Sequence, residues 1–108
     1  MTVPVFQLPA TRKLLNITAS TLVDSPNAPT VGPTAPLHLV SVIVNTPGST
    51  TTTINDCAST GAASASNTVL SIPATAVTGT VYLLNAPITS GLVVVPGTSA
   101  VIAVLYNS

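Results

Sequence analysis

Asp56 and Cys57 are neighbours in the chain, and with His38 they are the residue types that could do chemistry. A thiol, an imidazole and a carboxylate are what a cysteine enzyme uses as nucleophile, base and orienting acid. Cys57, however, lies in the run CASTGAASASNT, which matches no flanking signature of a known thiol enzyme. A small, partly buried cysteine suits that setting equally well. We therefore expect no catalytic residues and no enzymatic activity.

His38 is the only histidine, and a metal site would need further ligands around it. The other candidate ligands are two aspartates and one cysteine. His38 lies at the start of an apolar strand candidate, Leu37 to Val44, and we expect a solvent-facing or hydrogen-bonded side chain. The alternative is that its protonation tunes an interface. No metal and no cofactor is predicted.

Asp24 and Asp56 could form a carboxylate pair like that of glycosidases. Each of them adjoins residues typical of turns, Ser25-Pro26 in one case and Asn55 in the other. Aspartate in such a place usually accepts backbone hydrogen bonds. Sugar sites also tend to use stacked aromatic side chains, and the chain has no tryptophan. Turn roles are therefore expected for both aspartates.

Charged residues make up 4% of the chain, against about a quarter in an average soluble domain. Net charge is zero, and the one basic cluster is the pair Arg12 and Lys13, so nucleic acid is not an expected partner. That pair either contacts an acidic patch of a partner or keeps a strand edge solvated. We expect a surface with so few charges to be partly buried against copies of the chain or against partners. Together with the many Thr, Ser and Asn residues, this predicts a β-rich subunit of an assembly.

The longest apolar stretch, Gly91 to Tyr106, is interrupted at Pro96 to Ser99, so we expect no membrane span. The N-terminal region places its positive charges after the apolar residues and contains prolines, which is unlike a signal peptide. Cys57 is the only cysteine, so an intrachain disulfide is excluded. An interchain role for it conflicts with the reducing cytoplasm in which we expect the chain to be made.

An extended N-terminal arm is predicted for residues 1–12, because Pro4 and Pro9 block a helix and remove ladder donors. The arm either packs along its own domain or reaches across a neighbouring subunit. Its apolar and basic side chains are the predicted interface: Val3, Val5, Phe6, Leu8, Arg12 and Lys13.

A single all-β domain is predicted for residues 13–108, of about six to seven strands. The strand candidates are short, β-branched runs separated by proline or glycine. They are Lys13 to Val23, Leu37 to Asn45, Ser49 to Asp56, Val69 to Ile72, Thr80 to Asn85, Gly91 to Val95 and Ala100 to Tyr106. This spacing indicates a β-sandwich, jelly-roll-like, or a small barrel, and the pattern does not separate them.

Two turns in this pattern predict hairpins: Thr46-Pro47-Gly48, and Pro96 to Ser99. Two other segments predict loops. Asp24 to Pro36 contains four prolines and no periodicity, and Cys57 to Thr68 has few side chains able to anchor a helix in a core.

Two segments, TPGSTTTTINDCASTGAASASNTVLSIP and GLVVVPGTSAVIAVLYNS, resemble a family of small all-β proteins encoded among the structural genes of tailed bacteriophages. In that family a Thr-rich strand precedes a D-x-A-(S/T) and Ala-rich loop and an (I)P segment, and a G-(I/L)-V-V-V-P-G-T hairpin follows near the C-terminus. The matching positions are Asp56, Ala58, Ser59, Thr60, Ile72, Pro73 and Gly91 to Thr98. The strand around Ile17 to Val23 matches loosely, and the arm and the loop Asp24 to Pro36 depart from the pattern.

The resemblance implies a non-enzymatic component of the virion, made in the host cytoplasm. A capsid decoration, or cement, protein is the first expectation: a homotrimer on the capsid surface that binds the major capsid protein or another virion protein across capsomers. The second is a tail, neck or fibre-associated binding module. In that case the loop Asp24 to Pro36 would contact a host receptor or another virion protein.

Overall fold

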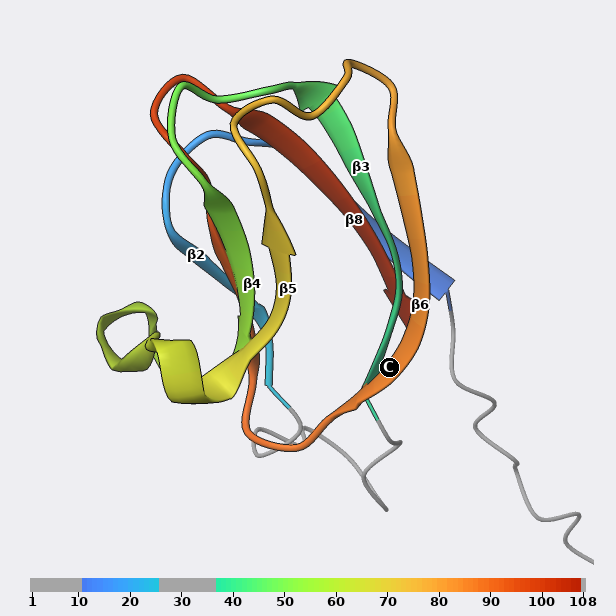
Figure 1. Cartoon of the computed structure of the whole chain (residues 1–108). Coiled ribbons are helices and arrows are strands. Elements are labelled where there is room, and N and C mark those ends of the chain that lie inside the picture. The colour runs from blue at the N-terminus through green and yellow to red at the C-terminus, as the bar shows by residue number, and fades with distance from the viewer. Residues whose placement is uncertain (1–10, 26–36, 108) are drawn as a thin grey trace, which may run out of the picture.

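The computed structural model describes residues 11–25 and 37–107, and these ranges form two stacked antiparallel sheets of four strands each (Figure 1). Sheet A has the order β1 (Thr11–Ile17), β8 (Val101–Asn107), β3 (Leu37–Thr46) and β6 (Val81–Ile88). Sheet B has the order β2 (Thr21–Asp24), β7 (Leu92–Val95), β4 (Thr52–Asp56) and β5 (Thr68–Ile72). The predicted all-β, sandwich-like fold is confirmed.

Aliphatic side chains fill the space between the two sheets. Because side chains alternate across a strand, every second residue of the central strands points inward. The largest inward, fully buried ones are Leu39, Val42, Val44, Ile54, Leu92, Val94, Ile102 and Val104. The core is therefore built of Val, Leu and Ile, as the composition requires.

Both predicted hairpins are wrong. β3 and β4 flank Thr46-Pro47-Gly48, yet β3 lies in sheet A and β4 in sheet B; β7 and β8 are separated in the same way. Turn residues indicate that the chain reverses direction, and they do not specify whether the returning strand joins the same sheet. Among consecutive strands of the described residues, only β4 and β5 pair with each other.

The run Lys13 to Val23 was predicted as one strand and forms two. Asn16 adopts a left-handed conformation with φ 56°, β1 ends at Ile17, and β2 begins in the other sheet at Thr21. Within β1 itself, Ile17 at its end is buried, whereas Leu15 is 52% exposed. Counting both, the described residues contain eight strands, more than the sequence indicated.

The Ala- and Ser-rich segment after β4 is a loop, as predicted, and contains two single 3-10 turns, η1 (Thr60–Ala62) and η2 (Ala65–Asn67). β1 already begins at Thr11. The arm residues Val3, Val5, Phe6 and Leu8, and residues 26–36 of the predicted long loop, lie outside the described residues. In the part that is described, no helix is long and apolar enough to cross a membrane.

Candidate functional site

The structure does not join Cys57 to His38. Cys57 follows β4 of sheet B, is buried, and its thiol donates to the carbonyl of Ser59, with 3.3 Å between sulfur and oxygen. His38 belongs to β3 of sheet A, where its register neighbours are Pro87 and Asn107. Within residues 11–25 and 37–107, no group of three or more His, Cys, Asp or Glu side chains could hold a metal ion.

Asp56 holds the loop between β6 and β7. Its Oδ1 accepts the backbone N–H of Ser90 at 2.8 Å and of Gly91 at 3.2 Å, and its Oδ2 accepts the N–H and the hydroxyl of Thr89 at 3.0 and 3.1 Å. Partial burial raises the pKa of Asp56, but these hydrogen bonds outweigh it and the pKa is lowered from its ordinary value. Both oxygens are thus occupied in fastening the loop.

Asp24 reaches the same end of sheet B. It is opposite Leu92 on one side of β7, while Asp56 is opposite Leu92 on the other side. One oxygen of Asp24 accepts the N–H of Ser25 at 2.8 Å. The predicted turn-type role of the two aspartates therefore matches their contacts, although the sequence did not indicate how many donors converge on Asp56.

A shallow, open depression of about 520 Å³ lies over β4 and β5 and is lined by Thr, Ser, Asn, Ala and Val side chains. Its polar centre is Asn55, whose amide nitrogen reaches the Ser64 carbonyl, the Asn67 amide oxygen and the Thr68 hydroxyl at 2.8–3.1 Å. The amide oxygen of Asn55 accepts the Thr53 hydroxyl at 2.8 Å. These partners anchor the loop after β4 to sheet B, so the depression presents groups that already bond to one another.

The outer face of sheet A is the surface that faces away from sheet B, and the strand register arranges it in three rows. The row at one end is Thr11, Asn107, His38 and Pro87; the middle row is Lys13, Leu105, Ser41 and Leu83; the third is Ala103, Ile43 and Val81. Leu15 follows Leu14 on β1 at the same end of the sheet as the third row, where the register of β1 with β8 shifts. Exposure is greatest at the two edges of the sheet, where Leu83 is 83% and Leu15 52% exposed. Apolar side chains thus lie on all four strands of this face; they are exposed at its two edges, whereas Ser41 and Ala103 at its centre are only 5% and 1% exposed.

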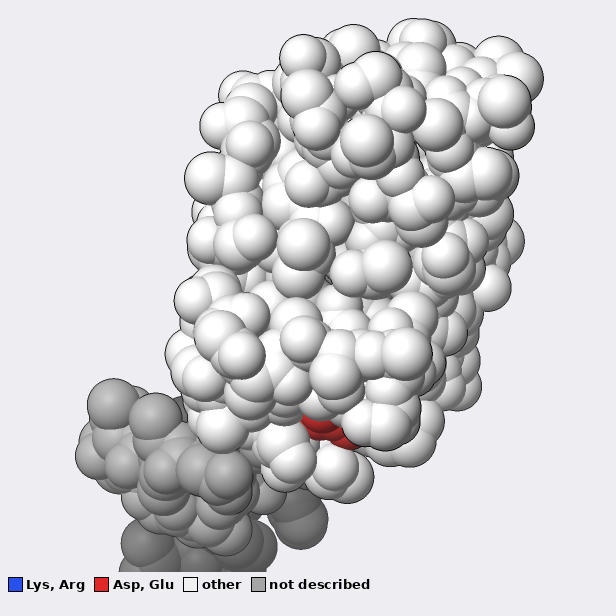
Figure 2. Space-filling model, turned by 60° about the vertical axis from the view of Figure 1, so that its left-hand side comes forward, with Lys and Arg blue, Asp and Glu red and all other residues white. Residues whose placement is uncertain are grey.

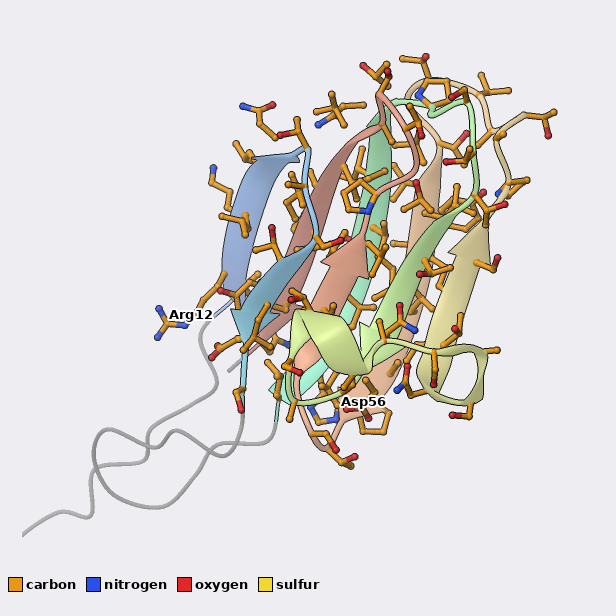
Figure 3. All side chains as sticks on the ribbon, turned by 90° about the vertical axis from the view of Figure 1, so that its left-hand side faces the viewer. Arg12 and Asp56 are labelled. Atoms are coloured by element: carbon orange, nitrogen blue, oxygen red, sulfur yellow. The ribbon has the colours of Figure 1, made fainter. Side chains whose placement is uncertain are left out.

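Charge is nearly absent from the surfaces around it. The middle row holds the one charged side chain of these three rows, Lys13, at the β1 edge. Figure 2 shows another face, which carries one small red area and no blue. In Figure 3, Arg12 stands at the β1 edge and Asp56 beside the loop after β4, so these two charges lie on different parts of the sandwich.

Of the predicted interface residues, the structure describes Arg12 and Lys13, and it places both on β1 beside the outer face of sheet A. The sequence did not single out Leu83, Val81, Ile43 or Leu105. The signal that could have found Val81 and Leu83 was the run TVYLLN, which is apolar at successive positions although it is an edge strand.

Comparison with known proteins adds no relative: no family model, no curated protein and no solved structure matches this chain. The candidate site is therefore assigned from its geometry alone. It is a largely apolar sheet face with one charged side chain, Lys13, and it is suited to protein–protein contact, so we take the outer face of sheet A as the candidate functional site.

Proposed function

We propose that this chain is a non-enzymatic structural protein of a bacteriophage virion, a capsid decoration protein that docks onto the major capsid protein or another virion protein through the outer face of sheet A. The observation that supports docking is that apolar side chains lie on this face from one edge to the other, from Leu15 on β1 to Val81 and Leu83 on β6. The resemblance of the segments from Thr46 and from Gly91 to phage structural proteins supports the virion as the place.

The size of the face fits this role. Four strands about 4.8 Å apart and about seven residues long cover on the order of 400–500 Å² in plan. A standard protein interface buries roughly 800 Å² per partner, so this face would supply a large part of one. Each apolar square ångström removed from water contributes about 25 cal/mol before the entropic costs of association. Repetition of the contact over a shell would strengthen it further through multivalency.

The strand order is consistent with the same proposal. We interpret β1-β8-β3-β6 facing β2-β7-β4-β5 as a jelly roll, an eight-stranded arrangement of two Greek keys. Viral capsid domains use it, as do lectins and cupins. A fold shared by such different proteins does not specify a function, so the proposal depends on the face and not on the topology.

The test is to locate the protein in particles of the phage whose genome encodes it, by mass spectrometry of purified virions and electron microscopy. We expect it on the capsid surface, with sheet A toward the shell. Leu15→Lys should reduce occupancy at least about tenfold, because it places a charge in an apolar contact. Val77→Lys, at a position 72% exposed outside the outer face of sheet A, is the control and should bind normally.

Absence of the protein from purified particles would contradict the virion assignment. Its presence at a tail or neck would replace the capsid location and support the second expectation from the resemblance. Equal occupancy of both lysine variants would exclude the outer face of sheet A as the docking surface.

A further inference from the structure

Sheet A ends in two edge strands that differ in how they are protected. β1 carries Arg12 and Lys13 and turns left-handed at Asn16, which are devices that keep an edge from pairing with another chain. β6 contains no charged residue, and its irregular residues, Asn85 with φ 128° and Pro87, lie in its second half. The first half of β6, Val81 to Leu84, therefore has none of these protections.

In that half of β6, the backbone N–H and C=O groups of alternate residues point away from β3, toward the open edge of the sheet. The N–H of Val44 donates to the carbonyl of Thr80 at 2.9 Å, which fixes where β3 and β6 exchange hydrogen bonds. In an antiparallel ladder the exchanging positions recur every second residue, so Tyr82, opposite Val42, also faces β3. Val81 and Leu83 lie between those positions, and their N–H and C=O groups point to the open edge.

The side chains of the same two residues are also available. Val81 is 50% and Leu83 83% exposed, and both belong to the outer face of sheet A, while Tyr82 turns inward and packs against the core. A strand laid along this edge would therefore meet two outward backbone pairs and two apolar side chains.

We propose that the occupant of this edge is a second copy of the chain, its β6 paired antiparallel with this β6 about a two-fold axis beside Tyr82. Val81 then lies opposite the partner's Leu83, and Leu83 opposite the partner's Val81. All four outward N–H groups meet outward carbonyls, and both cross-strand pairs are apolar.

Charge favours this pairing over the other edge. Two β6 strands bring no charged side chain together. Two β1 strands would bring Arg12 and Lys13 of both copies to one junction, where like charges repel. Pairing through β6 also joins two copies of sheet A into one eight-stranded sheet, which doubles its apolar outer face.

The expected assembly is a dimer, whereas the trimer expected earlier followed from analogy with proteins at symmetry axes. The inference does not depend on the virion assignment, because it is tested on the purified protein. Failure of the dimer would leave docking onto a particle intact, and absence from particles would leave the dimer intact.

The experiment is analytical ultracentrifugation of the full chain up to about 100 µM, well above a micromolar dissociation constant, for wild type, Leu83→Lys and Leu15→Lys. We expect wild type and Leu15→Lys to reach the mass of a dimer, and Leu83→Lys to weaken dimerisation at least about tenfold. Both leucines are exposed on edge strands of sheet A, so the two variants are matched. Circular dichroism checks that each variant folds.

Amide hydrogen exchange supplies a second measurement. The N–H groups of Val81 and Leu83 should gain protection as concentration rises, while that of Tyr82, bonded within the chain, should be protected at every concentration. A monomer at the highest concentration, a trimeric mass, or a dimer that persists in Leu83→Lys and dissociates in Leu15→Lys would overturn the proposal. So would protection at Val81 and Leu83 that is lost when residues 1–10 are deleted, since those residues would then be the occupant.

Discussion

Asp56 shows how one carboxylate can fix a whole loop in a chain with almost no charge. It adjoins the buried Asn55, so two consecutive polar side chains hold different segments: Asp56 the loop at Thr89 to Gly91, and Asn55 the loop after β4. Their neighbour Cys57 is buried and donates to Ser59. The residues that most suggested catalysis therefore have structural contacts, and the sequence could indicate their types but not these partners.

Replacing Asp56 should weaken the fold in a pH-dependent way. Because the folded pKa of Asp56 is lowered, its stabilising effect is present above the ordinary pKa and lost as the pH falls through the folded value. We expect Asp56→Asn to lower the free energy of unfolding by about 1–2 kcal/mol at neutral pH, a figure reduced for partial solvent exposure. The difference from wild type should shrink below about pH 4.

Urea unfolding at neutral and acidic pH measures this effect. Asp24→Asn is the control, since Asp24 accepts one backbone N–H, from Ser25, where Asp56 accepts three. A destabilisation by Asp56→Asn that is the same at both pH values would show that its charge does not contribute.

Among the elements, the connections between sheets were the hardest to predict. Short apolar, β-branched runs bounded by proline- or glycine-containing turns located six of the eight described strands singly and merged β1 and β2 into one run, because those patterns are local. The sheet that each strand joins is decided by contacts far along the sequence, such as the hydroxyls of Thr50 and Thr52 that accept the N–H groups of Thr98 and Gly97 at 2.8 Å. Neither those pairs nor the outer face of sheet A could be derived before the register was known.

Gly97 is required where this inter-sheet connection meets Thr50. A Cβ added at Gly97 would run into the carbonyl of Thr50, whereas one added at Gly61 would meet nothing within 4 Å. We expect Gly97→Ala to cost about 2–4 kcal/mol in urea unfolding. Gly61→Ala should change stability by less than about 1 kcal/mol. Equal effects would mean that the connection can shift to accept a side chain.

On the scale of the whole molecule, the near absence of charge bears on the proposed association of two copies. With net charge zero and 4% charged residues, little long-range repulsion keeps the subunits apart. The exposed apolar side chains lie largely along the edges of sheet A, at Leu14, Leu15, Val81 and Leu83. Association should therefore be driven by apolar burial and edge hydrogen bonds, with little contribution from ion pairs.

Salt should distinguish these forces. Raising NaCl from about 0.1 M to about 1 M shortens the Debye length from about 10 Å to about 3 Å and weakens exposed ion pairs. We expect the self-association constant to change by less than about threefold in sedimentation experiments over this range. Sulfate at the same ionic strength should strengthen association, because it favours apolar burial. A large loss of association in NaCl would instead point to Arg12 and Lys13 as the contacts.

The alternation of consecutive strands between the sheets bears on how the chain reaches this state. Among the described strands, β4 and β5 are the only consecutive ones that pair with each other, so each of the others pairs with a strand distant along the polypeptide. Closing such long loops costs chain entropy before the paired strands stabilise the fold. Folding should therefore be slow, on the order of milliseconds to seconds. While the chain folds, the unprotected half of β6 can pair with strands of other proteins as well as with other copies of this chain. A high local concentration during synthesis would therefore favour aggregation.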